Sequence, residues 1–285
     1  MKKTIIVIIL FIIGIFLISY PFFSNLINLF HQTKVIKNYR EEVDKLSEDK
    51  KQEMMEKATK YNDELERDNY IDVSLNENKN QDAPSYLNLL DLGEAMAYIV
   101  IPKIDINLPI YHGISEDVLQ NGVGHIESSS LPIGGKSTHC VLTGHTGIAR
   151  GKIFDNINQL VIGDLFYISV LGNILAYKVD DIKIVEPSDT EAIRIEEDKD
   201  YVTLVTCTPY MINSHRLLVR GERVDAVAIQ DEESNKDNQL YNLNEYSDDI
   251  IEKNMDFSNI IIMAAILLLI IFLFIIHLMN KNKKA

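Results

Sequence analysis

Two long apolar segments without any charged residue limit what this chain can fold into. Residues 4–23 and residues 258–278 contain no Asp, Glu, Lys or Arg. A helix needs about 20 apolar residues to cross the hydrocarbon core of a bilayer, so each segment is long enough. We therefore expect an N-terminal membrane anchor over residues 1–24 and a C-terminal transmembrane helix over residues 258–279.

The flanks of these segments predict how the chain is oriented. A cleaved signal peptide is an alternative for the first segment, because two lysines precede it, but no Ala-x-Ala-like cleavage site follows. Lysines at positions 2–3 and within residues 281–284 lie at the outer ends of the two segments, and basic flanks stay in the cytoplasm. We expect a two-pass protein held in the lipid bilayer of the cell membrane. Both termini, including residues 280–285, are expected in the cytoplasm, and the part between the spans is expected to be extracellular.

The whole chain has a net charge of −14, and all of its acidic residues lie between the two spans, since the outer flanks hold lysine and no acidic residue. A negative field repels nucleic acid and anionic lipid headgroups, so we expect no nucleic-acid partner. An acidic surface suits a basic, lysine-bearing partner, and solubility explains the same charge equally well.

Three stretches are distinguished by their composition. Residues 33–74 lack Gly and Pro and mix charges of both signs with sparse apolar residues, which predicts a helical segment that packs one narrow stripe onto another element. Residues 75–96 begin polar and are interrupted by Pro84, which predicts a mobile loop. Residues 230–257 are acidic and poor in apolar residues, which predicts a linker to the second span.

Residues 97–229 have the pattern of short strands at regular spacing. Runs rich in Val, Ile, Leu and Thr end in turn residues, and Gly172-Asn173 marks a tight hairpin. Short helices are expected near residues 115–120, with serine as the N-cap, and near residues 153–160. Many short strands with few helices predict a mainly β domain in the form of a closed antiparallel β-barrel.

A cysteine and an arginine mark the ends of two neighbouring strands in TLVTCTPYMINSHRLLVRG, residues 203–221. If these strands pair antiparallel across residues 208–214, Cys207 and Arg216 come to the same end of the sheet. His145 ends another strand, between glycines in VLTGHTG, at a turn that exposes the imidazole. A thiol needs a nearby cation or base to act as a nucleophile, so Cys207, His145 and Arg216 are the candidate catalytic residues.

Two other interpretations of the same side chains stay open. Cys140 and Cys207 lie in the part expected outside the cell, where a disulfide is permitted, whereas free thiols in apolar strands behave as small hydrophobic residues. A zinc site would take its ligands from His139, Cys140, His145, Cys207 and His215. The sequence lacks a CxxC or HxxxH pair at ligand spacing, so we expect no metal and no cofactor.

Longer stretches around these residues resemble one enzyme family. TLVTC, residues 203–207, is similar to the TLxTC signature of sortases, the membrane-anchored cysteine transpeptidases of Gram-positive cell surfaces. The resemblance continues through residues 101–113, 124–139, 142–147 and 207–223, so it spans nearly the whole expected barrel in order. The pattern is most similar to class C, the branch that polymerises pilins, whose members also tend to carry a second, C-terminal membrane span.

The resemblance implies a sortase-like barrel with Cys207 as the thiol nucleophile, His145 as acid and base, and Arg216 as the cation. It implies cleavage of an LPxTG-like sorting signal between Thr and Gly, and transfer through a thioester to a lysine amine of a pilin during pilus assembly. Thr206 either contacts the substrate or supports its strand. A sortase that anchors surface proteins to the peptidoglycan of the cell wall is one alternative, and a non-catalytic, membrane-tethered binding module is another.

A possible lid departs from the class C pattern. Class C members often cover the site with a lid that contains Asp-Pro-aromatic, whereas this chain has DAPSY at residues 82–86. The departure leaves open whether residues 75–91 form a closed lid.

Overall fold

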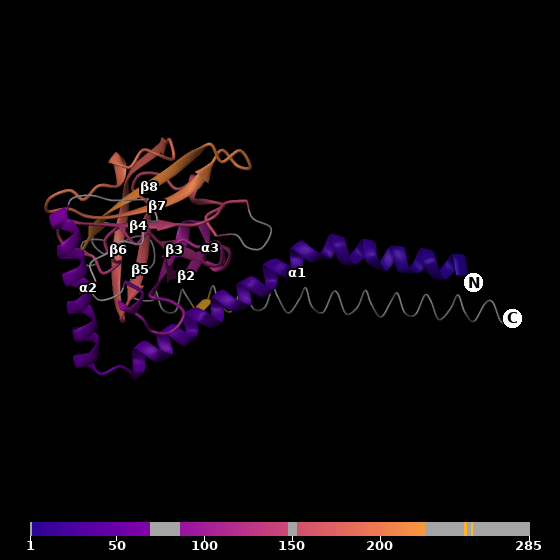
Figure 1. Ribbon diagram of the computed structural model, residues 1–285, viewed down its shortest axis with the longest axis horizontal. Helices are drawn as coiled ribbons and strands as arrows, with labels where there is room; N and C mark the ends of the chain where they lie inside the picture. The colour runs from indigo at the N-terminus through magenta and orange to yellow at the C-terminus, as the bar shows by residue number, and fades with distance from the viewer. Residues whose placement is uncertain (1, 69–85, 148–152, 226–247, 250–251, 253–285) are drawn as a thin grey trace, which may run out of the picture. The chain divides into compact units, whose positions relative to one another are not determined.

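The structure is a computed structural model that describes residues 2–68, 86–147, 153–225, 248–249 and 252 (Figure 1). Residues 248, 249 and 252 belong to a separate unit, residues 242–285. The strands are β1 (Ala97–Ile101), β2 (Ile106–His112), β3 (Val123–His125), β4 (Thr138–Thr143), β5 (Leu165–Val170), β6 (Asn173–Val185), β7 (Asp200–Thr208) and β8 (His215–Val224). The helices are α1 (Lys2–Lys45), α2 (Glu48–Asp68), α3 (Glu116–Asn121) and the 3-10 helices η1 (Tyr86–Asn88), η2 (Pro102–Ile104), η3 (Ile157–Gln159) and η4 (Glu191–Ile193).

The described strands close into one barrel in the order β1-β2-β3-β4-β7-β8-β6-β5, with β1 paired to β5. The predicted closed barrel is confirmed, but its purely antiparallel pairing is wrong, because β2 pairs parallel with β3, and β4 with β7. Parallel neighbours need a crossover connection. α3 lies in the first crossover and residues 144–199 form the second. Such crossovers leave no mark in the periodicity of a single strand.

The barrel interior is filled by large apolar side chains from alternating positions of the strands. Phe166 of β5 and Tyr177 of β6 stack there with their ring centroids 5.6 Å apart. The predicted hairpin between these strands is confirmed, since Val170 pairs with Asn173 and Gly172 has a φ of +83°. Glycine suits this left-handed backbone because it has no Cβ.

The predicted helical segment 33–74 contains the end of one helix and the whole of a second. α1 ends at Lys45 and α2 begins at Glu48. Between them, the Ser47 hydroxyl accepts a hydrogen bond from the Lys50 amide at 3.3 Å. Serine is a preferred N-cap, so the break between the helices has a local cause.

α1 and α2 both contact the barrel through a few buried residues (Figure 1). Asn62 of α2 donates to the Leu131 carbonyl at 3.4 Å and accepts from the Leu131 amide at 2.7 Å. One turn earlier, Ala58 is fully buried against the core. The Tyr39 hydroxyl of α1 accepts a hydrogen bond from the Leu171 amide at 2.9 Å. The two helices are therefore packed parts of the folded domain.

The two short helices predicted inside the barrel region have different outcomes. α3 is confirmed, with Ser115 as the N-cap whose hydroxyl accepts from the Val118 amide at 3.4 Å. The helix expected over residues 153–160 is reduced to the single turn η3. Short apolar runs do not separate a helix from an irregular buried segment, which explains the difference.

The segment predicted over residues 75–96 is described from Tyr86 onward. Tyr86, Leu89 and Leu90 are buried, and the chain continues from them into β1. This later half of the segment therefore contributes side chains to the core, although Leu87 is exposed. Residues 75–85 lie outside the described residues.

The first predicted membrane span, residues 4–23, is part of α1. Within the described residues, no helix reaches the length and apolar character needed to cross a membrane. The predicted second span, residues 258–279, and the tail, residues 280–285, lie outside the described residues, as does most of the predicted linker, residues 230–257.

Candidate functional site

The ends of β4, β7 and β8 meet at one edge of the barrel, and the three candidate catalytic residues lie there. β7 and β8 pair antiparallel with Cys207 opposite Arg216, which confirms the pairing predicted for these strands. β4 and β7 pair parallel with Thr143 opposite Val205, so both end at the same edge. His145 follows directly after the end of β4. The fold therefore brings the three side chains to adjacent strand ends.

The turn that carries His145 is fastened to β7. The Gly144 amide donates to the Val205 carbonyl at 3.1 Å, and the Thr206 hydroxyl donates to the Gly144 carbonyl at 2.7 Å. Thr206 is 4% exposed, so its side chain faces the protein and holds the histidine turn beside the strand that ends at Cys207. Of the two roles left open for Thr206, this hydrogen bond supports the structural one.

A second contact joins the histidine turn to the loop between β7 and β8. Gly147 has a φ of +77°, and a Cβ there would lie 2.6 Å from a ring carbon of Tyr210. Glycine therefore lets the ring pack on the turn. Tyr210, Met211 and Ile212 are exposed, up to 80% for Met211. These apolar side chains beside Cys207 offer contact area to a ligand.

The two cysteines are both free, and they differ in their surroundings. Cys140 of β4 is 3% exposed in the core, and burial raises the pKa of its thiol. Cys207 is half-buried at the end of β7. A buried thiol of raised pKa is inert at neutral pH, whereas a thiol at a strand end can meet a substrate. The disulfide alternative is therefore not realised, and Cys207 is the accessible thiol of the two.

The Arg216 guanidinium contacts the end of the loop between β7 and β8. Its Nη1 donates to the carbonyls of Asn213 at 3.2 Å and His215 at 3.1 Å. A guanidinium carries five N–H donors in a planar fork, and both of these bonds use one nitrogen. The side chain is half-exposed and lies across the strand ladder from Cys207. An anchored, accessible cation in this place can stabilise a negative charge that forms beside the thiol.

Glu116, at the start of α3, contacts the candidate histidine. Its Oε2 lies 3.4 Å from His145 Nε2, with the two side chains 68% and 26% exposed. The pKa of the Glu116 carboxyl is lowered, first by a hydrogen bond from Gln120 and then by His145. Sequence reasoning missed this residue, because a carboxylate in a short amphipathic helix gives no sign that it will meet a histidine on another element.

The residues considered as zinc ligands are placed differently. His139 is buried, with Nδ1 2.7 Å from the Arg194 carbonyl and Nε2 2.7 Å from Thr203 Oγ1. Burial lowers its pKa to about 4. Over residues 2–68, 86–147 and 153–225, no group of three or more His, Cys, Asp or Glu side chains is arranged to hold a metal ion.

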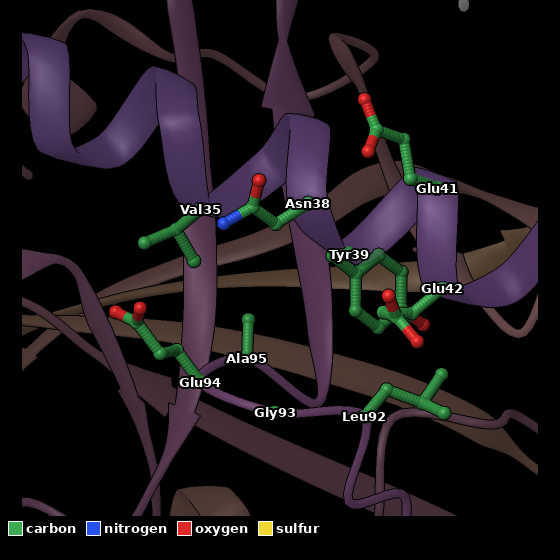
Figure 2. Close-up of a pocket in the computed structure, with 9 residues that line it drawn as sticks. All are labelled: Val35, Asn38, Tyr39, Glu41, Glu42, Leu92, Gly93, Glu94 and Ala95. Atoms are coloured by element: carbon green, nitrogen blue, oxygen red, sulfur yellow. The ribbon is translucent and has the colours of Figure 1, made fainter.

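A cavity of about 440 Å³ lies elsewhere, between α1 and the segment that precedes β1 (Figure 2). Figure 2 shows Val35 and Tyr39 of α1 facing this segment, which carries Glu94, whereas the Glu41 side chain points away from the segment. None of the three candidate catalytic residues lines the cavity. The candidate site is therefore an open edge of the barrel, separate from this cavity.

Comparison with known proteins gives this arrangement a context. Residues 99–224 match the Sortase domain family. Sortase D of Bacillus subtilis is 31% identical over 137 residues, which are 47% of this chain and 66% of that protein. Sortase A of Bacillus anthracis is 26% identical over 229 residues, which are 79% of this chain and 96% of that protein.

Solved structures of sortase C proteins have higher identity. Sortase C-1 from Actinomyces oris is 48% identical with a TM-score of 0.57, covering 62% of this chain and 99% of that one. Clostridium perfringens sortase C, solved with the C-terminal cell wall sorting motif, is 45% identical with a TM-score of 0.60, covering 67% and 98%. Sortase C1 from Streptococcus agalactiae is 42% identical with a TM-score of 0.63, covering 67% and 98%.

Proposed function

Because the chain belongs to the sortase family of cysteine transpeptidases, we propose that it is a class C enzyme that joins pilin subunits. The substrate is an LPxTG-like sorting signal, cleaved between Thr and Gly, and the acceptor is a lysine amine of a second subunit. The observation that carries the proposal is the meeting of Cys207, His145 and Arg216 at adjacent strand ends. The similarity to sortase C structures at 42–48% identity supports the class.

The first half of the reaction forms a thioester. The Cys207 sulfur, having given its proton to His145, attacks the threonine carbonyl carbon, and the carbonyl oxygen becomes an oxyanion. The planar N–H donors of Arg216 stabilise that charge. His145 gives a proton to the glycine nitrogen as the C–N bond breaks, so the glycine end leaves as an amine. The sorting signal remains attached to the Cys207 sulfur through the carbonyl carbon of its threonine.

The second half transfers the threonine to the acceptor. The lysine amine loses a proton to His145, and its nitrogen attacks the thioester carbon. The C–S bond breaks and returns the thiolate to Cys207. One amide has then replaced another, and the enzyme is ready for a second cycle. Such an exchange is close to neutral in free energy, so it needs no ATP, which is absent outside the cell.

Water competes with the lysine amine for the thioester. The exposed apolar side chains of Tyr210, Met211 and Ile212 lie on the loop that follows Cys207. A pilin surface packed on this loop would displace water from the edge and favour aminolysis over hydrolysis. The proposal thus assigns the loop to substrate contact and Thr206 to support of the histidine turn.

The proposed enzyme works at the outer face of the cell membrane. The uncharged apolar segments at residues 4–23 and 258–278, with lysines on their outer sides, support an anchor at each end and both termini in the cytoplasm. The barrel then lies outside, where sorting signals arrive and pilins assemble.

Mass spectrometry of the full chain after incubation with LPxTG peptides tests the nucleophile and the substrate class together. The expected product is an adduct on Cys207 with the mass of the peptide through its threonine. Cys207→Ala should form none. Wild-type protein whose Cys207 resists both the peptide and a small thiol reagent would instead be a non-catalytic binding module.

The acceptor decides between pilus assembly and cell-wall anchoring. Incubation with a pilin that carries the signal should give a ladder of covalent polymers on a denaturing gel. A single product joined to a peptidoglycan amine, without a ladder, would make the protein a housekeeping anchor of surface proteins and overturn the pilin assignment.

A further inference from the structure

A carboxylate outside the three candidate residues touches the reacting imidazole. Glu116 uses both of its oxygens: Oε2 lies 3.4 Å from His145 Nε2, and Oε1 accepts a hydrogen bond from Gln120 Nε2 at 2.9 Å. The bond from Gln120 restrains the carboxylate on the surface of α3. The oxygen that faces His145 therefore belongs to a carboxylate whose other oxygen already has a partner on α3, and the side chain is exposed.

The turn that carries Glu116 is fixed by distant parts of the chain. Asn28 and Gln32 of α1 donate from their side-chain amides to the carbonyls of Gln120 at 2.8 Å and Asn121 at 2.9 Å, at the end of α3. Both donors are buried. Carbonyls at a helix end need such partners, and these bonds fix α3 against α1. α1 thereby sets where Glu116 stands.

We propose that Glu116 is a positioning residue for His145, orienting the imidazole at the barrel edge before the amine leaves. The inference rests on the proposed transpeptidase function, because it assigns the imidazole a proton to deliver. A nucleophile, a base and a third group that orients the base are the recurring parts of covalent catalysis by Ser and Cys enzymes. In this enzyme Glu116 is that third group, and it lies on α3, outside the barrel.

The other groups of the site lie on neighbouring elements. Arg216 of β8 and Cys207 of β7 pair across the strand ladder. Asp155, beyond the histidine turn, accepts a hydrogen bond from the Gly147 amide at 2.7 Å and so restrains the turn backbone. Glu116 is the carboxylate for which a direct contact with the ring is observed among the described residues.

The effect of this contact is largest for the acid step. His145 must deliver a proton to the glycine nitrogen as the C–N bond breaks, so the direction of the ring matters there. Removing the carboxylate should leave the ring less well oriented. An exposed ion pair has a small free energy, so we expect a loss of about threefold in kcat with the KM for the peptide unchanged.

The test compares Glu116→Gln with Asp117→Asn in the full chain in detergent. Both changes remove one carboxylate charge from the same exposed turn of α3, but only residue 116 contacts His145. Cleavage of a Leu-Pro-Ala-Thr-Gly peptide is followed at near-neutral pH over a range of peptide concentrations, so that kcat and KM are obtained separately. We expect a lower kcat with an unchanged KM in Glu116→Gln, and wild-type values of both in Asp117→Asn.

The outcomes separate this inference from the proposed function. Glu116→Asp keeps the charge and should restore kcat in part, and added salt should reduce the difference between wild type and Glu116→Gln. An equal loss of kcat in both charge-removing variants would assign the effect to the general field of α3 and overturn the positioning role. An unchanged kcat in Glu116→Gln, with an active wild type, would also overturn it. A wild type that forms no thioester would instead remove the proposed function.

Discussion

The same three residue types occur twice on β4, β7 and β8 and the turns that follow them, once at the barrel edge and once within the strands. The edge set is Cys207, His145 and Arg216, and the inner set is Cys140, His139 and Arg220. The edge set is partly exposed, whereas Cys140 and His139 are buried. Since both sets share one sheet, what separates them is their position along the strands.

The inner set is enclosed by permanent partners. Arg220 Nη2 lies 2.7 Å from Asp180 Oδ2, Nη1 lies 3.2 Å from Glu196 Oε1, and the guanidinium sits 4.0 Å from the ring centroid of Tyr201. His139 has a contact on each ring nitrogen. A cation and an imidazole with such partners stabilise the fold and have little capacity left for a substrate. Chemistry therefore needs strand ends, where the polar groups of the protein do not saturate one another.

Replacing each cysteine in turn should give the largest difference between the edge set and the inner set. Cys207→Ala should lower transpeptidation at least about a thousandfold while the unfolding temperature stays unchanged, because it removes the nucleophile from an edge position. Cys140→Ser should leave the rate of the folded enzyme unchanged and lower the free energy of unfolding by about 1–3 kcal/mol, because it buries a hydroxyl among apolar groups. Peptide-transfer assays and thermal unfolding measure both. Pilin cross-linking by Cys207→Ala would remove Cys207 from the mechanism.

Replacing the edge arginine should lower the rate, and replacing the inner arginine should lower the stability. Both effects should be smaller than those of the cysteine replacements. Arg216→Lys keeps the charge and loses the planar fork, so we expect kcat to fall about a hundredfold with little change in stability. Arg220→Lys loses the paired contact with Asp180 and should lower the free energy of unfolding by about 1–2 kcal/mol. Steady-state kinetics and urea unfolding distinguish the cases. Near-normal turnover in Arg216→Lys would make that arginine structural.

Acid should destabilise the folded protein through protonation of His139, a member of the inner set. Its pKa falls from an ordinary value of 6.5 to about 4 on folding, because burial disfavours the charged ring. The unfolded chain thus takes up a proton at higher pH than the folded one. The free energy of unfolding is therefore highest, with respect to His139, above about pH 6.5. It falls by about 3 kcal/mol at most as the pH is lowered toward about 4.

Urea unfolding of His139→Gln across this pH range checks the assignment. The variant should be less stable near neutral pH and should show a shallower dependence on pH. Some slope should persist, because burial also lowers the pKa of His112. A slope equal to that of the wild type would exclude His139 as its source.

Thr206 supports the turn that carries His145 of the edge set, and its replacement should have the smallest effect. Thr206→Val removes the hydrogen bond to the Gly144 carbonyl and should lower kcat about tenfold, because His145 is then less well placed. Thr206→Ser keeps the hydroxyl and should stay near wild type. An increase in the KM for the peptide, with kcat unchanged, would show substrate contact in place of support.

Local patterns predicted the parts of the fold that depend on neighbouring residues. The hairpin at Gly172 and the pairing of Cys207 with Arg216 follow from strand alternation and a short connection, so the sequence was sufficient. The parallel pairing of β4 with β7 depends on a connection of more than fifty residues, and the contact of Glu116 with His145 joins separate elements. Neither leaves a local signal. The catalytic roles remain predictions that rest on the family resemblance and on this geometry.

The pair of hydrogen bonds between Asn62 and Leu131 has a practical consequence for producing this protein without its apolar ends. Trimming the chain back to the first strand would strip Leu131 of the side chain that satisfies its peptide group, and would uncover the core surface that Ala58 shields. Such a fragment should aggregate on expression. A truncation that starts ahead of Asn28 retains α2 and the part of α1 that contacts the barrel, so the smallest autonomous form of the enzyme is larger than its barrel.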